Sequence, residues 1–154
     1  MVPRIPVALT TFTLAALVAA AAAKAAPEPA ARTFTVPLDG RAETNIVHPS
    51  GGTGDPDGTG VVRLTVDPDS KLVCYDFNLS GVATPMMAHI HRGSELNNGP
   101  TVVTLFTGLG GELEGCVPWI RNRLAEIVSD PSNFYVNVYT TEYPDGAVRG
   151  QLGG

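Results

Sequence analysis

The sequence is poor in several residue types on which particular functions depend. Its 154 residues include two cysteines, three histidines and one tryptophan, and ten basic residues stand against fifteen acidic ones. The resulting net charge of −5 disfavours nucleic acid and anionic membranes as partners. The sequence also lacks a Ser–His–acid motif and a glycine-rich phosphate-binding loop, so no motif indicates an enzyme.

A long apolar run occurs only at the N-terminus. Arg4 precedes an uncharged apolar stretch from Val7 to Ala23, and Ala23-Lys24-Ala25 has small residues where a signal peptidase requires them. We therefore expect a signal peptide over residues 1–25 and an Ala- and Pro-rich linker over residues 26–32. The alternative, an uncleaved membrane anchor, is disfavoured because the run is short and rich in Ala and Thr. The expected location is secreted or periplasmic/extracellular, with no stable membrane span after cleavage.

Two cysteines in an exported chain indicate one disulfide, between Cys74 and Cys116. Closing a loop of about 43 residues would stabilise the fold by roughly 4 kcal/mol on the chain-entropy estimate. The alternative, a pair of thiolate metal ligands, has no CxxC or CxxH spacing to support it. Asn78-Leu79-Ser80 matches a glycosylation sequon.

Short segments rich in β-forming residues recur through the rest of the chain, with turn residues between them. The expected strands are 34–38, 61–66, 72–79, 86–91, 101–106, 134–140 and 147–152. The Pro-containing turns at Asp67–Ser70 and Tyr143–Gly146 each predict a hairpin between the strands they join.

One segment has helical periodicity instead. Apolar residues recur at helical spacing between Pro118 and Ser129, which predicts a short helix there. The Gly- and Pro-rich segment from Gly40 to Gly60 is expected to be a long loop. We therefore expect an all-β domain, an antiparallel Greek-key β-sandwich or barrel of about seven strands with one short helix.

His89-Ile90-His91 is the most specific local motif. Alternate residues of a strand share a face, so both imidazoles could approach one metal ion. His48, the remaining histidine, is the candidate third ligand, and imidazole ligands favour copper or zinc over calcium or magnesium. The alternative is that both imidazoles only form hydrogen bonds with neighbouring loops.

The last predicted hairpin has one polar face. Asn137 and Tyr139 lie on one of its strands, and Arg149 and Gln151 lie on the other. These side chains could surround the histidine pair and form a polar pocket. Alternatively, they are the solvated face of an antiparallel sheet, which needs no functional explanation.

Two groups of motifs carry a family resemblance. The first is residues 88–93, Ala-His-Ile-His-Arg-Gly, followed by Asn98-Gly99-Pro100, and the second runs from Pro131 to Leu152. Together they resemble the chordin-type (CHRD) domain family, whose C-terminal pattern is P..fYvNvHT..yP.GaiRGQL. The resemblance spans residues 33–152 and implies an exported β-domain with an immunoglobulin-like or related sandwich architecture. Tyr139 stands where the family pattern has His, which would weaken a three-histidine metal site.

The resemblance limits the functions to be expected. In animal chordin such domains accompany cysteine-rich modules that bind growth factors, and this sequence contains no such module. The chain is loosely similar to copper,zinc superoxide dismutase in its HxH strand, cysteine pair and Arg149, but three histidines are too few for that enzyme's metal ligands. The expected function is a non-enzymatic binding or structural module for an unidentified extracellular protein or surface ligand. The competing prediction is a small copper- or zinc-binding metalloprotein that uses the His-x-His strand.

Overall fold

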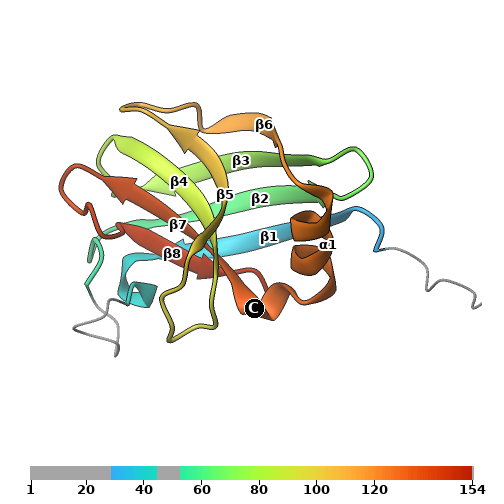
Figure 1. Ribbon diagram of the computed structural model, residues 1–154. Coiled ribbons are helices and arrows are strands. Elements are labelled where there is room, and N and C mark those ends of the chain that lie inside the picture. Colours follow the sequence, from blue (N-terminus) through green and yellow to red (C-terminus); the bar gives the residue numbers. More distant parts are fainter. Residues whose placement is uncertain (1–28, 45–52, 154) are drawn as a thin grey trace, which may run out of the picture.

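The computed structural model describes residues 29–44 and 53–153, which form one antiparallel sheet and one α-helix (Figure 1). The strands are β1 (Arg32–Asp39), β2 (Thr59–Asp67), β3 (Leu72–Ser80), β4 (Pro85–Arg92), β5 (Thr101–Thr107), β6 (Glu114–Pro118), β7 (Phe134–Thr140) and β8 (Val148–Gln151). The helix α1 spans Arg121–Ser129, and the short 3-10 helices η1 and η2 span Gly40–Ala42 and Pro131–Asn133.

The sheet has the strand order β5-β4-β7-β8-β1-β2-β3-β6. Its edge strands β5 and β6 approach each other, so the sheet curls into a nearly closed barrel (Figure 1). The expected all-β fold with one helix is confirmed. Of the two expected architectures the structure has the barrel, a single curled sheet in place of two stacked ones.

Alternation of side chains along the strands decides which residues fill the barrel. In β3, for example, Val73, Tyr75 and Phe77 are buried and their neighbours face outward. The helix α1 packs beside β2 and adds Leu124 and Ile127 to the same core. The described strands therefore line the barrel interior mainly with apolar side chains, and the polar residues singled out from the sequence lie on the outer face of the sheet.

The strand β6 is the main correction to the sequence prediction. Its composition, with Gly and Pro among five residues, is poor for a strand, yet it pairs with β3. The pairing places Cys116 directly opposite Cys74, and the two form the expected disulfide with a Cα–Cα distance of 4.0 Å. Pro118 therefore ends a strand, and the predicted helix begins only at Arg121.

The structure confirms the two predicted turns, but the predicted long loop contains regular structure at both ends. Asp67–Ser70 and Tyr143–Gly146 connect β2 to β3 and β7 to β8, as expected. The segment expected to be one long loop includes η1 at its start and the first residues of β2 at its end. The middle of that segment, with His48, and the expected signal peptide lie outside the described residues. Within the part of the chain that the structure describes, no helix is long and apolar enough to cross a membrane.

Candidate functional site

The outer face of β4, β7 and β8 carries the polar residues that the sequence singled out. Pairing of β4 with β7 places His89 opposite Asn137 and His91 opposite Tyr135, and pairing of β7 with β8 places Arg149 on the other side of Asn137. The alternate side chains of these strands are apolar and lie in the core. One face of this part of the sheet thus supplies the core, and the opposite face supplies the candidate site.

Most of this polar face is buried. Asn137 and Arg149 are only 4% and 2% exposed, because residues 43–44 and the β4–β5 loop cover them. Tyr139 and Gln151 lie at the margin and are partly exposed. The interpretation of this face as an ordinary solvated sheet surface is therefore wrong, because the covering loops exclude water from its centre.

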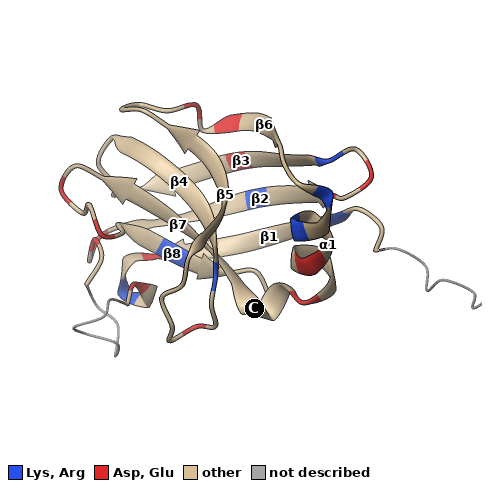
Figure 2. Cartoon of the chain, viewed as in Figure 1, with Lys and Arg blue, Asp and Glu red and all other residues tan. Residues whose placement is uncertain are grey.

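Arg149 holds the covering segments in place. It is the basic residue in the middle of β8 (Figure 2). Its guanidinium donates hydrogen bonds to the side chains of Thr44 and Asn98, both at 2.9 Å, and to the carbonyl oxygens of Ser94 at 2.8 Å and Asn97 at 3.1 Å. Guanidinium has five N–H donors in a rigid plane, so one arginine can join three segments of the chain.

Tyr135 connects Arg149 to the histidine pair. The Arg149 guanidinium carbon lies 3.5 Å from the Tyr135 ring centroid, within the range of a cation–π contact. The His91 imidazole stacks on the same tyrosine, with ring centroids 5.0 Å apart and an interplanar angle of 10°. The Tyr135 hydroxyl accepts a hydrogen bond from the Gly99 amide at 3.2 Å. These contacts fix both the imidazole of His91 and the loop beside it.

Both ring nitrogens of His91 have hydrogen-bond partners. Nδ1 lies 2.9 Å from the Gly99 carbonyl oxygen, and Nε2 lies 2.8 Å from the Tyr139 hydroxyl. A carbonyl oxygen only accepts, so Nδ1 carries the proton and Nε2 accepts from Tyr139. Burial lowers the pKa of His91 and raises the pKa of Tyr139, which keeps both groups neutral.

Gly99 can lie this close to the end of β4 only because it has no side chain. A Cβ atom at position 99 would lie 1.6 Å from the Arg92 carbonyl oxygen. The predicted turn containing Asn98-Gly99-Pro100 therefore has a second role, since it positions the carbonyl that orients His91.

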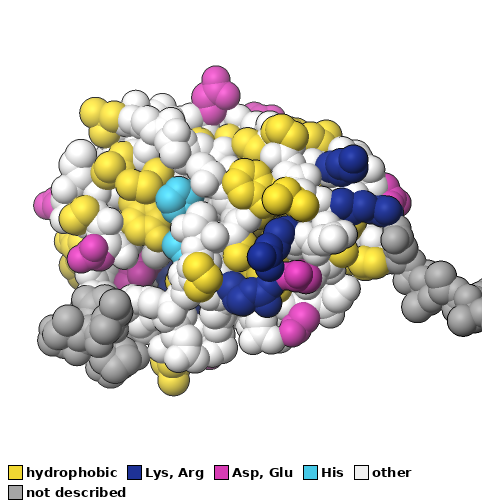
Figure 3. Space-filling view, in the orientation of Figure 1, with side chains coloured by type: hydrophobic (Ala, Val, Ile, Leu, Met, Phe, Trp, Pro, Cys, Tyr) yellow, Lys and Arg dark blue, Asp and Glu magenta, His cyan; other side chains and the backbone are white. Residues whose placement is uncertain are grey.

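His89 is the more exposed member of the histidine pair, although it is itself partly buried. Its ring centroid lies 5.6 Å from that of His91 and 5.5 Å from that of Tyr139. Within the described residues its ring nitrogens form no hydrogen bond, and Figure 3 shows histidine at the surface, bordered by hydrophobic side chains. Met87, the register partner of Tyr139, lies on the same outer face of β4. His89 is thus the imidazole that remains available to a ligand.

Glu43 is buried at the inner edge of the site. Its side chain is 1% exposed, and a Cβ atom at position 146, where the glycine has φ +135°, would lie 2.6 Å from the Glu43 carboxyl carbon. Burial raises the pKa of Glu43 to about 8, although Arg149 and Asn137 oppose the shift. Among the described residues, Glu43 Oε1 and Asn137 Oδ1 have no hydrogen-bond partner. A protonated carboxyl can donate to such an acceptor, so the neutral form suits this environment.

The comparisons with known proteins decide the family. A sequence model of the CHRD domain matches residues 34–152. The chain belongs to the CHRD domain family. No curated protein and no solved structure matches the chain. The family assignment therefore rests on the domain match over nearly the whole chain.

The structure brings together only some of the residues expected to form a site in this CHRD domain. His89, His91, Asn137, Tyr139 and Arg149 lie on one face, whereas His48 lies outside the described residues. Within the described ranges, no group of three His, Cys, Asp or Glu residues could hold a metal ion. Gln151 lies at the periphery, where its amide donates to the Gly93 and Ser132 carbonyl oxygens.

Sequence reasoning missed the residues that cover the CHRD site. Glu43 and Thr44 follow η1, and no local pattern connects them to a strand more than a hundred positions later. Met87 could have been identified from the sequence, because it precedes His89 by two positions on a predicted strand. Strand alternation alone places the two side chains on the same face.

Proposed function

We propose that this CHRD domain is an exported, non-enzymatic binding module. Its binding surface is the His89 face, which we define as the outer surface formed by Met87, His89 and Tyr139. The observation that supports this proposal most strongly is the contrast between the two histidines. His91 has a partner at each nitrogen, whereas His89 is partly exposed and has none among the described residues.

This contrast favours binding over catalysis. A general acid or base must exchange a proton with substrate, and it needs a free nitrogen within hydrogen-bond reach. His91 has no free nitrogen, because Gly99 and Tyr139 occupy both, and the Arg149 and Tyr135 contacts hold its surroundings rigid. His89 has free nitrogens, but among the described residues it is hydrogen-bonded to no nucleophile or carboxylate that would make it a catalytic base. The buried polar residues thus hold the sheet rigid beneath the partly exposed His89 imidazole and its apolar neighbours. Such rigidity is typical of a preorganised binding surface.

Export is supported by two independent features. The N-terminal leader has the charge, apolar run and cleavage residues of a signal peptide. The disulfide between Cys74 and Cys116 suits an oxidising compartment outside the cytoplasm.

A saturation binding experiment tests this function. Untagged protein is collected after export by the cells that produce it, labelled, and added back to those cells and to their extracellular material. We expect saturable binding that His89→Ala abolishes and that Asn122→Ala, an exposed change on α1, leaves intact. Equal binding by wild type and His89→Ala would contradict the proposed surface, and protein found only in the cytoplasm would contradict export.

A further inference from the structure

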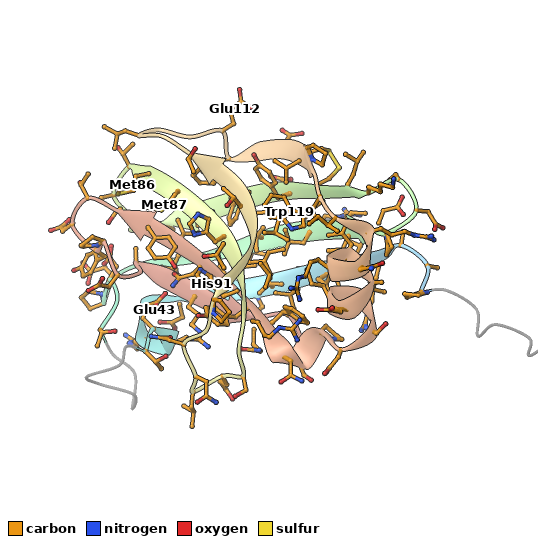
Figure 4. All side chains as sticks on the ribbon, viewed as in Figure 1. Glu43, Met86, Met87, His91, Glu112 and Trp119 are labelled. Carbon is orange, nitrogen blue, oxygen red and sulfur yellow. A yellow bond between two sulfur atoms is a disulfide. The ribbon has the colours of Figure 1, made fainter. Side chains whose placement is uncertain are left out.

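Three side chains with metal-binding atoms occupy alternate positions of β4. Met87 pairs with Tyr139, His89 with Asn137 and His91 with Tyr135, and alternation places all three on the outer face. Figure 4 shows Met87 towards one end of β4 and His91 farther along the same strand. One thioether and two imidazoles therefore form a line on a rigid strand.

The second histidine of this line is already oriented as a metal ligand. Metal-binding histidines commonly donate their other ring N–H to a backbone carbonyl, which fixes the tautomer and the ring. His91 Nδ1 does so with the Gly99 carbonyl oxygen at 2.9 Å. Its Nε2 lone pair is thereby directed at the Tyr139 hydroxyl, on the side of the strand where His89 lies.

The spacing of the two imidazoles suits a shared ion. A metal bound to a ring nitrogen at its usual distance lies about 3 Å from the ring centre, so two rings on one ion lie up to about 6 Å apart. The His89 and His91 centroids are 5.6 Å apart. Rotation of the partly exposed His89 side chain and displacement of the Tyr139 hydroxyl from His91 Nε2 would therefore converge both nitrogens, and β4 need not move.

The chemistry of the donors selects the metal. All three donors are uncharged, and a thioether is a soft ligand that favours Cu(I) over zinc, calcium or magnesium. A divalent ion would gain no compensating carboxylate here, and Arg149 adds positive charge close to His91. We infer that Met87, His89 and His91 bind one Cu(I) ion on the His89 face. This inference rests on the proposed function, because it names a ligand for the same surface.

A competition titration tests this site. The full chain, exported with its own leader and carrying no tag, is titrated anaerobically with Cu(I) in ascorbate against a chromophoric Cu(I) chelator. Wild type is expected to bind one equivalent. His89→Ala and Met87→Leu are each expected to weaken binding at least about tenfold, the loss of one ligand contact. Both side chains are partly exposed, so an unchanged unfolding midpoint verifies that each variant folds.

Two control variants test whether Cu(I) binding depends on the named ligands and not on another methionine or histidine. Met86→Leu alters the residue at the register shift between Pro85 and Met87, and His48→Ala removes the remaining histidine. Both are expected to bind Cu(I) as wild type does. The site is overturned if wild type binds no Cu(I), if Met87→Leu has no effect, or if either control loses as much affinity as His89→Ala.

Tyr139→Phe separates a hydrogen-bond partner from a ligand. Cu(I) at His91 Nε2 must replace the hydrogen bond from the Tyr139 hydroxyl, so removing that hydroxyl is expected to strengthen binding a few-fold. Loss of binding in Tyr139→Phe would contradict the assigned ligand set. Cell binding that survives a Cu(I) chelator, in protein that takes up no Cu(I), would overturn the copper site and leave the proposed binding module standing.

Discussion

Tyr139 donates its hydroxyl hydrogen to His91 Nε2 across 2.8 Å, and this hydrogen bond marks the boundary between two halves of the site. On its inner side, His91, Tyr135 and Arg149 form a continuous buried set of stacked and hydrogen-bonded groups. On its outer side, His89 lies beside Tyr139 and reaches solvent. The inner half supports the surface, and His89 on the outer half is free to meet a ligand. The proposed Cu(I) ion would cross this boundary, because it would replace the Tyr139 hydrogen bond at His91 Nε2.

Replacing Arg149 with lysine should destabilise the domain. A lysine ammonium cannot reach Thr44, Asn98 and the two loop carbonyls at once, and it would leave buried acceptors unpaired. We expect Arg149→Lys to lower the free energy of unfolding by about 2–4 kcal/mol, measured by urea denaturation. Arg63→Lys, an exposed change on β2, is the control and should alter it by less than about 0.5 kcal/mol. Equal stability of the two variants would show that Arg149 does not hold the loops.

Glu43 should make the folded state less stable as the pH rises. Its pKa is about 8 in the folded protein against an ordinary value of 4.5, so between these pH values the folded protein keeps a proton that the unfolded chain releases. The contribution of Glu43 is therefore fully present below pH 4.5 and is lost as the pH rises to about 8. The whole shift corresponds to a loss of up to about 5 kcal/mol in the free energy of unfolding.

Comparison of Glu43→Gln with wild type isolates the pH dependence of stability that Glu43 causes. The histidines also titrate, but they contribute alike to both proteins. Thermal unfolding should show similar midpoints at pH 5 and a higher midpoint for Glu43→Gln at pH 8.5. Glu142→Gln, at an exposed position, should follow the wild-type curve at both pH values. A Glu43→Gln variant that also follows the wild-type curve would mean that the buried carboxyl is already ionised.

Removing the disulfide should weaken the attachment of the edge strand β6 to β3. Cys74 and Cys116 join the edge strand β6 to β3, and both lie on the outer face. The double variant Cys74→Ser/Cys116→Ser should lose about 4 kcal/mol of unfolding free energy, the chain-entropy estimate for this loop. Thiol labelling of the folded wild type should detect no free cysteine, and two labelled thiols would contradict the pairing.

The strands were predictable because their signals are local. Alternation in β3 and the Pro-containing turns beside it define both the strand and its hairpin within a few residues. The strand β6 escaped prediction because its pairing depends on the disulfide and on β3, which are distant in sequence. The family match over residues 34–152 agrees with the motifs from which the resemblance was first drawn.

The histidine pair was predictable, whereas its surroundings were not. Strand alternation places His89 and His91 on one face from sequence alone. Burial of Arg149 depends on contacts with residues as far away as Thr44, 105 positions earlier. No pattern in a single sequence reports a contact of that range, and so a polar sheet face and a buried polar site could not be distinguished until the loops were placed.

The most direct test of the account is a measurement of the two imidazoles by nitrogen-15 NMR. We expect His91 to show a single tautomer with the proton on Nδ1, because of the Gly99 carbonyl, and His89 to show averaging between tautomers. Tyr139→Phe should shift the Nε2 signal of His91 and leave its tautomer unchanged. A proton on Nε2 of His91, or a fixed tautomer at His89, would contradict the division between a locked and an available histidine.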